Sequence, residues 1–231
     1  MMSDTQDSRG CGPPAIILAS ASPRRRELFA LLGLPFRAGK AEVDESSHPR
    51  ESPQEMAARL ALSKARAVAG LYQVPVVGCD TVVTIGGESL GKPLDAEEAR
   101  RMLASLRGRT HTVYTGIAVV GKGHEVVQVV ETPVTMRDYT NQELSAYIAS
   151  GDPLDKAGAY GIQHPTFRPV ASWEGCYANV MGLPLCHLAR ALGAWSITPP
   201  ADVPTACQAH TGQPCRAFRT ILPEQSVADA N

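Results

Sequence analysis

The feature that most constrains the fold is a run of ten residues, Val76 to Ile85, that is apolar almost throughout. Such a run is typical of a β-strand covered on both faces, because a half-exposed strand would alternate apolar and polar residues. Gly86-Gly87 follows and predicts a tight turn into a short antiparallel partner. We therefore expect a sheet with further layers on both sides of this strand. Asp80 is the only charged residue in the run.

Strand-like and helix-like patterns alternate along the rest of the chain. Helix starts are marked by a capping residue with a proline or an acidic residue close behind it, as at Ser22-Pro23, Ser52-Pro53, Asp95 and Thr140. Because the order of elements is mixed, we expect an α/β fold with a mixed sheet flanked by helices. The predicted strands cover residues 16–19, 76–85, 112–120, 125–135 and 169–173, and the predicted helices end near residues 33, 70, 108 and 192.

The composition suits one globular domain, since the chain has 231 residues, 24.6 kDa and 44% hydrophobic residues. We place this domain at 15–196, between a disordered polar N-terminal tail, 1–14, and an irregular C-terminal tail rich in proline, 197–231. Lys and Arg total 22 against 23 Asp and Glu, and this net charge of −1 provides no general attraction for nucleic acid. The chain lacks an apolar stretch that suits a membrane span or a signal peptide. We therefore expect a cytoplasmic protein with no nucleic-acid or membrane partner.

The six cysteines do not predict a disulfide scaffold, because they are sparse and irregularly spaced in a chain of this length. The C-terminal tail contains Cys207, His210 and Cys215, one ligand short of a tetrahedral zinc site. Cys176 or Cys186 could supply the missing ligand, although we favour coincidence as the explanation of this grouping.

A cluster of serines and arginines, Ser20 to Arg26, lies where the first predicted strand turns into a helix. Three arginines in the first turn of a helix oppose the helix dipole, and each costs roughly a few tenths of a kcal/mol unless an anion binds. A phosphate would supply that anion, held by backbone N–H groups, serine hydroxyls and arginine side chains. A solvated charge run is the alternative interpretation.

Asp80 needs a polar partner, because an unpaired carboxylate in an apolar run costs on the order of several kcal/mol. It suits a general base or a ligand of a divalent ion, and a structural Asp satisfied by backbone donors is the alternative. Lys64 follows the apolar stripe of its predicted helix, so its ammonium group must reach a polar partner or the surface. Lys92, within GKP, and Glu45, in an acidic loop, are weaker candidates when each is considered alone.

The segment from Asp155 to Gln163 places small residues between polar ones, as in a loop that approaches a flat ligand. The amide of Gln163 offers both a donor and an acceptor, which suits the O4 and N3–H edge of uracil or thymine. An ordinary glycine-rich turn is the alternative.

Together these segments resemble the Maf family of nucleoside triphosphate pyrophosphatases, a family named for septum formation. The resemblance runs from about Ile16 to Gly193, and the matching segments follow the family's order. They are LASASPRRREL at 18–28, Glu45, Lys64-Ala65-Arg66, GCDTVV at 78–83, GKP at 91–93 and DKAGAYGIQ at 155–163.

The resemblance implies an enzyme that hydrolyses a nucleoside triphosphate to the monophosphate and pyrophosphate, with a divalent metal cation, Mg²⁺ or Mn²⁺, as its cofactor. It also implies an elongated mixed sheet flanked by helices, in an architecture like that of inosine triphosphatases. Asp80 would activate the water that attacks the α-phosphorus, with Glu45 and Lys92 in the same catalytic group. The residues implied to bind the substrate are Ser20, Arg24, Arg25, Lys64, Thr81, Lys156 and Gln163.

The last matching segment resembles the form found in the branch of the family that acts on dTTP and UTP, and modified pyrimidine nucleotides are a further implied substrate. Arg24, Thr81 and Gln163 occupy the positions that the resemblance assigns to base choice. The chain departs from the family after Gln163, because His164 to Pro169 replaces a continuation that is often rich in glycine.

Two alternatives stay open at the level of the sequence. The chain could be a nucleotide-binding regulator of cell division with little catalysis, or an enzyme with the same chemistry and another base preference. A binding module needs the arginines but no positioned carboxylate, so Asp80, Glu45 and the two lysines favour an enzyme. The resemblance is also compatible with a homodimer, and the metal ligands are unknown from the sequence.

Overall fold

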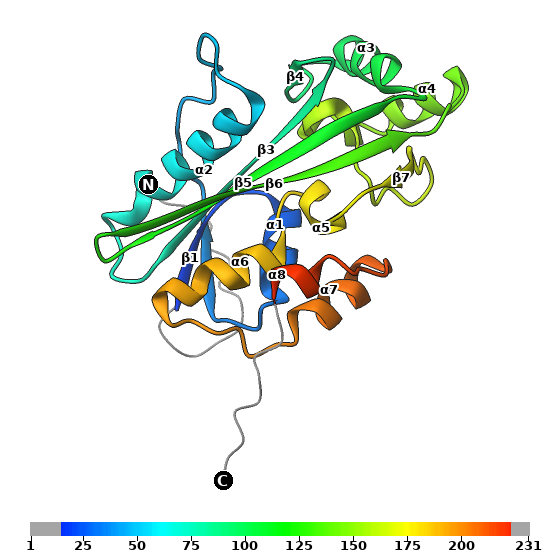
Figure 1. Cartoon of the computed structure of the whole chain (residues 1–231). Helices are drawn as coiled ribbons and strands as arrows, with labels where there is room; N and C mark the ends of the chain where they lie inside the picture. The colour runs from blue at the N-terminus through cyan, green and yellow to red at the C-terminus, as the bar shows by residue number, and fades with distance from the viewer. Residues whose placement is uncertain (1–14, 223–231) are drawn as a thin grey trace.

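The computed structural model describes residues 15–222, whose seven strands form one mixed sheet in the order β2-β1-β3-β5-β6-β7, with β4 paired to β3 (Figure 1). β1 is parallel to β2 and β3, and the other pairings are antiparallel. The expected mixed α/β sheet flanked by helices is confirmed. The strands are β1 (Ile16–Ala19), β2 (Phe36–Gly39), β3 (Val76–Ile85), β4 (Glu88–Leu90), β5 (Thr110–Gly121), β6 (His124–Met136) and β7 (Val170–Trp173).

Helices cover both faces of the sheet, and Figure 1 shows the long strands β3, β5 and β6 running side by side across the molecule. Helix α2 packs against β3 and β5, while α3 and α4 lie together at one end of the long strands. The helices are α1 (Pro23–Ala30), α2 (Pro53–Ala69), α3 (Ala96–Leu106), α4 (Asn141–Ala149), α5 (Tyr177–Val180), α6 (Leu185–Leu192), α7 (Val203–Thr211) and α8 (Phe218–Ile221), with short 3-10 turns η1 (Asp152–Asp155), η2 (Ala157–Ala159) and η3 (Gly193–Trp195).

β3 is buried on both faces, as its apolar sequence predicts. On one face Val77 and Cys79 join the larger hydrophobic core, which also contains residues of α1 and α6. On the other face Val76 belongs to a smaller core with Ala61 and Ala65 of α2. Burial on both sides removes most of this strand from water, so the carboxylate of Asp80 lies in an unusually dry part of the sheet.

Helix α2 lies close to the sheet because two strand residues beneath it have no side chain. A Cβ atom added at Gly78 of β3 would lie 2.1 Å from the backbone oxygen of Ala61, and one added at Gly116 of β5 would lie 2.1 Å from that of Ala57. The start of α2 is fixed by the predicted capping box, in which Ser52 and Glu55 bond each other's backbone N–H groups. This close packing brings one face of α2, including Lys64, onto β3.

Two parts of the fold differ from the sequence-based expectation. Residues from 197 onward were expected to be irregular, which is wrong for α7 and α8, because these helices bury Val203 and Ile221. Asp202 caps α7 with a proline in the first turn, the same signal as at α1 and α2, but the surrounding proline-rich composition obscured it. β2 was not predicted because it is a four-residue edge strand without clear alternation.

The predicted tail at residues 1–14 lies outside the described residues, as do residues 223–231. The division of the chain at 15 and 196 stays a prediction. Among the described helices, none has the length and apolar character needed to cross a membrane.

Replacing Gly78 with alanine tests the close packing of α2. The free energy of unfolding of the Gly78→Ala variant should be about 2–3 kcal/mol lower than that of the wild type, because the new Cβ would clash with the backbone of α2, which cannot easily move. Urea unfolding measures this difference. Gly39→Ala in β2 is the matched control, because nothing lies within 4 Å of its added Cβ. Equal destabilisation by the two substitutions would contradict the packing argument.

Candidate active site

All ten residues singled out in the sequence line one cleft of about 470 Å³, a volume typical of small-molecule sites. The cleft is bounded by the turn between β1 and α1, by α2, by β3 and by the loop that follows α4. Its ten predicted residues are Ser20, Arg24, Arg25, Glu45, Lys64, Asp80, Thr81, Lys92, Lys156 and Gln163.

A lysine and two carboxylates meet at the floor of the cleft. The Lys64 Nζ lies 2.5 Å from Oδ1 of Asp80 and 2.6 Å from Oε1 of Glu45. The side chains of Lys64 and Asp80 are each 11% exposed, whereas that of Glu45 is 56% exposed. Lys64 therefore does not extend to the surface as a solvated charge, and Asp80 has the cationic partner that its burial requires.

The electrostatics of Glu45 follow from this arrangement. Partial burial raises its pKa, but the hydrogen bond and charge of Lys64 oppose burial, and the net result is a pKa below the usual value for a glutamate. The charges of Lys92 and Arg25 act in the same direction. Glu45 is therefore ionised near neutral pH, and its carboxylate contacts the same ammonium group as that of Asp80.

Arg25 is bound by the protein on three sides. Its Nε donates to the backbone oxygen of Gly182, and its two terminal nitrogens donate to the backbone oxygen of Cys79 and to Oγ1 of Thr81, at 2.8–2.9 Å. A guanidinium has five N–H donors, so two remain for a ligand. Arg25 thus ties the first turn of α1 to β3 as well as lining the cleft.

Sequence reasoning missed the residues that support Thr81. Its hydroxyl also lies 3.0 Å from that of Thr115, which donates to the backbone oxygen of Asn179. Gly182 permits the approach of Arg25, because its φ is +105° and an added Cβ would lie 3.2 Å from both Arg25 Nε and Thr81 Oγ1. Thr115 and Asn179 carry no local signal, since only the tertiary fold brings them to this place.

The turn between β1 and α1, for which we predict phosphate binding, is held by two serine side chains. Ser22 caps α1 and its Oγ accepts the backbone N–H of Arg25, while Ser20 is buried and its Oγ accepts the N–H of Ser22. Arg24 projects from the same turn and its guanidinium lies 3.2 Å from Oδ2 of Asp155. The first turn of α1 thus lines the cleft together with the arginines Arg24 and Arg25.

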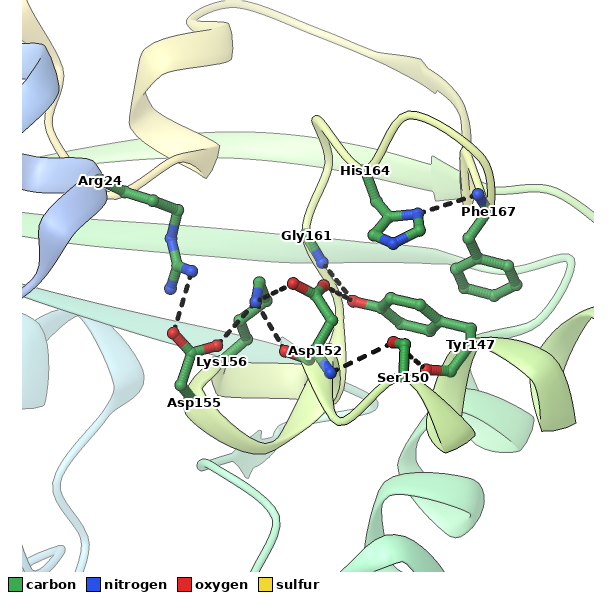
Figure 2. A network of polar contacts seen from close by, with 9 residues as sticks. All are labelled: Arg24, Tyr147, Ser150, Asp152, Asp155, Lys156, Gly161, His164 and Phe167. Carbon is green, nitrogen blue, oxygen red and sulfur yellow. Dashed lines mark hydrogen bonds and ion pairs between the residues drawn. The ribbon is translucent and has the colours of Figure 1, made fainter.

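The loop after α4 contributes Lys156 and Gln163 to the cleft, and Figure 2 shows the Lys156 ammonium between Asp152 and Asp155. Lys156 is buried and its ammonium group contacts Asp152 and Asp155. Gln163 is exposed at the rim, as is Lys92 across the cleft. The segment after Gln163 turns away: Phe167 enters the hydrophobic core, and its backbone N–H donates to Nδ1 of His164. The departure from the family pattern therefore falls outside the cleft.

The carboxylates at the floor fit a divalent cation that arrives with a polyphosphate. Glu45 and Asp80 both bind the Lys64 ammonium, so their oxygens converge. Mg²⁺ is commonly held by one or two carboxylates, with substrate phosphates and water completing its shell. Within residues 15–222 no group of three or more His, Cys, Asp or Glu side chains could hold a metal ion.

The cysteine grouping of the C-terminal segment gives no metal site in the described residues. Cys207 and Cys215 line a small apolar cleft together with Cys176 and Cys186, but His210 does not line it. Burial raises the pKa of the Cys207 thiol to about 11, which keeps it protonated near neutral pH.

Known proteins are similar to this chain over most of its length. A family model described as Maf-like protein matches residues 15–195. The dTTP/UTP pyrophosphatase of Moorella thermoacetica is 51% identical over 185 residues, covering 79% of this chain and 95% of the relative. That of Myxococcus xanthus is 51% identical over 171 residues, covering 74% and 87%. Among solved structures, a HAM1 protein from Coxiella burnetii has a TM-score of 0.43 at 17% identity and covers 68% of this chain and 84% of that chain.

Removing the central cation tests the geometry of the floor. In the Lys64→Met variant the pKa of Glu45 should rise above its wild-type value, because burial continues to raise it while the largest opposing influence is lost. Carbon-detected NMR titration of the glutamate carboxyl groups measures this change. Lys122→Met, in the turn between β5 and β6, is the control and should leave the pKa of Glu45 unchanged. An unchanged pKa in Lys64→Met would refute the contact.

Proposed function

The chain belongs to the Maf-like protein family, and from that premise we propose that it is a pyrophosphatase that hydrolyses dTTP and UTP to the monophosphate and pyrophosphate. Relatives that cover most of this chain at 51% identity are named dTTP/UTP pyrophosphatases. The observation that carries the proposal is the buried Asp80, held by Lys64 beside Glu45 at the floor of a cleft rich in cations.

The cations and N–H donors of the cleft bind the triphosphate. Arg24 and Lys92 supply positive charge at the rim, and Lys64 supplies it at the floor. The hydroxyl of Ser20 and the backbone N–H of Arg24 in the first turn of α1 add donors that need no reorganisation when the charged group arrives. Arg25 lines the cleft with two N–H donors left for a phosphate, so this arginine both binds the substrate and supports the site.

Asp80 is the general base of the reaction. Its carboxylate takes a proton from water as the water oxygen bonds to the α-phosphorus, and the bond from that phosphorus to the bridging oxygen breaks. The electron pair of the broken bond leaves with pyrophosphate, whose charge is balanced by Lys92 and the arginines. Lys64 holds Asp80 in place by the 2.5 Å contact.

A divalent cation, Mg²⁺ or Mn²⁺, would be held by Glu45 and Asp80 together with the phosphates. When bound, it would neutralise charge on the triphosphate and polarise a phosphoryl oxygen. Glu45 supports catalysis from this position, since its carboxylate is ionised and shares the Lys64 ammonium with Asp80.

Base choice belongs to Gln163, Arg24 and Thr81. The Gln163 amide at the rim can donate to O4 and accept from N3–H, a pattern shared by uracil and thymine. Cytosine presents the reverse pattern, with an amino donor at position 4 and an acceptor at N3. In the same orientation, the Gln163 NH₂ group would face the cytosine amino group and the Gln163 oxygen would face the N3 lone pair. This supports a preference for dTTP and UTP, and for modified pyrimidines that keep this edge.

The alternative of a regulator with little catalysis is less well supported. Such a protein would need the cationic rim, but binding alone does not require a buried carboxylate paired with Lys64 at the floor of the cleft, and such a carboxylate in a cleft supports chemistry. The cytoplasm is the proposed compartment, because free nucleoside triphosphates are available there, and the net charge of −1 supports no nucleic-acid partner. The homodimer and the absence of a membrane partner stay predictions.

Substitution of the proposed base tests the function directly. Asp80→Asn should lower kcat/KM for pyrophosphate release from dTTP and UTP by about a thousandfold, because the isosteric amide cannot accept the water proton. Pyrophosphate release in the presence of Mg²⁺ is the measurement. Asp202→Asn is the matched control, since asparagine also caps a helix and Asp202 lies at the start of α7. If the wild type binds nucleotide but releases no more pyrophosphate than the Asp80→Asn variant, the regulator with little catalysis is favoured.

A further inference from the structure

We propose that Tyr147 and Asp152 are positioning residues, which hold Lys156 and the backbone of Gly161 and so fix the segment that places Gln163 against the base. The loop from Asp152 to Gln163 is called the base loop here. The inference rests on the proposed function, since it concerns how that function selects a pyrimidine.

Lys156 acts on the protein and not on the substrate. Its Nζ donates to the backbone oxygen of Asp152 at 2.6 Å, to Oδ1 of Asp152 at 2.8 Å and to Oδ1 of Asp155 at 2.7 Å. An ammonium group has three donors, and these three oxygens use all of them. The side chain is 8% exposed, and its Cε would lie 3.0 Å from a Cβ added at Gly161, so the stem of Lys156 supports the base loop from inside.

Tyr147 of α4 joins the two ends of the base loop (Figure 2). Its hydroxyl donates to Oδ2 of Asp152 at 2.7 Å and accepts the backbone N–H of Gly161 at 3.1 Å. Burial, and then the bond to Asp152, raise the pKa of Tyr147, so the hydroxyl remains protonated and can serve as donor. Gly161 is two residues from Gln163, so this hydroxyl holds the backbone close to the base-reading amide.

The base loop needs such anchors because part of its backbone is strained. Gly158 has φ of +70° and Ala159 has φ of +60°, and alanine rarely adopts that conformation. Both residues are buried, and Gly158 packs so closely on Val83 that an added Cβ would lie 2.9 Å from its Cγ1. A backbone held in this form persists only when the surrounding contacts determine it.

The same contacts connect the base loop to the phosphate-binding turn. Asp155 accepts Lys156 through Oδ1 and Arg24 through Oδ2, so one carboxylate joins the base loop to α1. On the other side, the backbone N–H of Gly158 donates to the backbone oxygen of Gly91, next to Lys92. Displacement of the base loop would therefore alter base recognition first and the phosphate side to a smaller degree.

Tyr147→Phe removes the hydroxyl and keeps the ring. The Tyr147 ring stacks on Phe167 with centroids 4.3 Å apart and contacts His164 edge to face at 4.8 Å, and phenylalanine preserves both contacts. Tyr139→Phe is the matched control. Tyr139 is also buried against Phe167, at 4.9 Å, but its hydroxyl donates to the backbone oxygen of Leu103, away from the base loop.

The experiment compares kcat and KM for dTTP and for dCTP in the wild type, Tyr147→Phe and Tyr139→Phe, with Gln163→Glu as the reference for a lost base contact. In Tyr147→Phe the KM for dTTP should rise about tenfold while kcat changes less than about twofold, and the preference for dTTP over dCTP should fall toward that of Gln163→Glu. Tyr139→Phe should keep the wild-type values. A purely structural role would lower the amount of folded enzyme without changing KM or the preference.

Wild-type-like KM and preference in Tyr147→Phe would overturn the proposal. Asp152→Asn is a second variant, which keeps the shape of the side chain, weakens the hold on Lys156 and should change KM in the same direction. If the wild type itself releases no pyrophosphate from dTTP or UTP, the proposed function fails. Calorimetric binding of dTTP then tests the base loop, with weaker binding in Tyr147→Phe as the supporting result and equal binding as the contradicting one.

Discussion

The buried contact between Lys64 and Asp80 is the interaction on which the rest of the site depends. Removing one charge from such a pair leaves the other without compensation in a medium that solvates it poorly, so the loss of either residue destabilises the site. The contact exists because α2 lies directly on β3, and α2 lies there because Gly78 and Gly116 leave room for its backbone. The acidic loop then adds Glu45 to the same ammonium group.

Around this floor, two sets of contacts hold the walls of the cleft. Arg25 joins the turn between β1 and α1 to β3 and to Gly182, and thereby fixes Thr81 at the edge of the floor. Asp155 joins that turn to the base loop through Arg24. The phosphate-binding wall and the base-reading wall are thus separate in sequence but share one network of charged hydrogen bonds, which explains how a single cleft can discriminate a base and cleave a phosphoanhydride.

Sequence patterns predicted most of this architecture where the signal was local. The apolar run of β3 with its one carboxylate, the capping box of α2 and the serine-proline start of α1 each placed an element and a candidate residue together. They did not predict where long side chains end. Lys156 and Arg25 were expected to reach the substrate, yet most of their donors bind protein oxygens, because partners such as Asp152 and Gly182 are brought near only by the tertiary fold. Tyr147 was missed for the same reason.

The central claim is that water activated at Asp80 attacks the α-phosphorus. The most direct test is hydrolysis of dTTP in water enriched in ¹⁸O, followed by mass spectrometry of both products. The label should enter dTMP and pyrophosphate should stay unlabelled, because the new bond forms at the phosphorus that remains with the nucleoside. Label in pyrophosphate, or release of inorganic phosphate in its place, would rule out attack at the α-phosphorus.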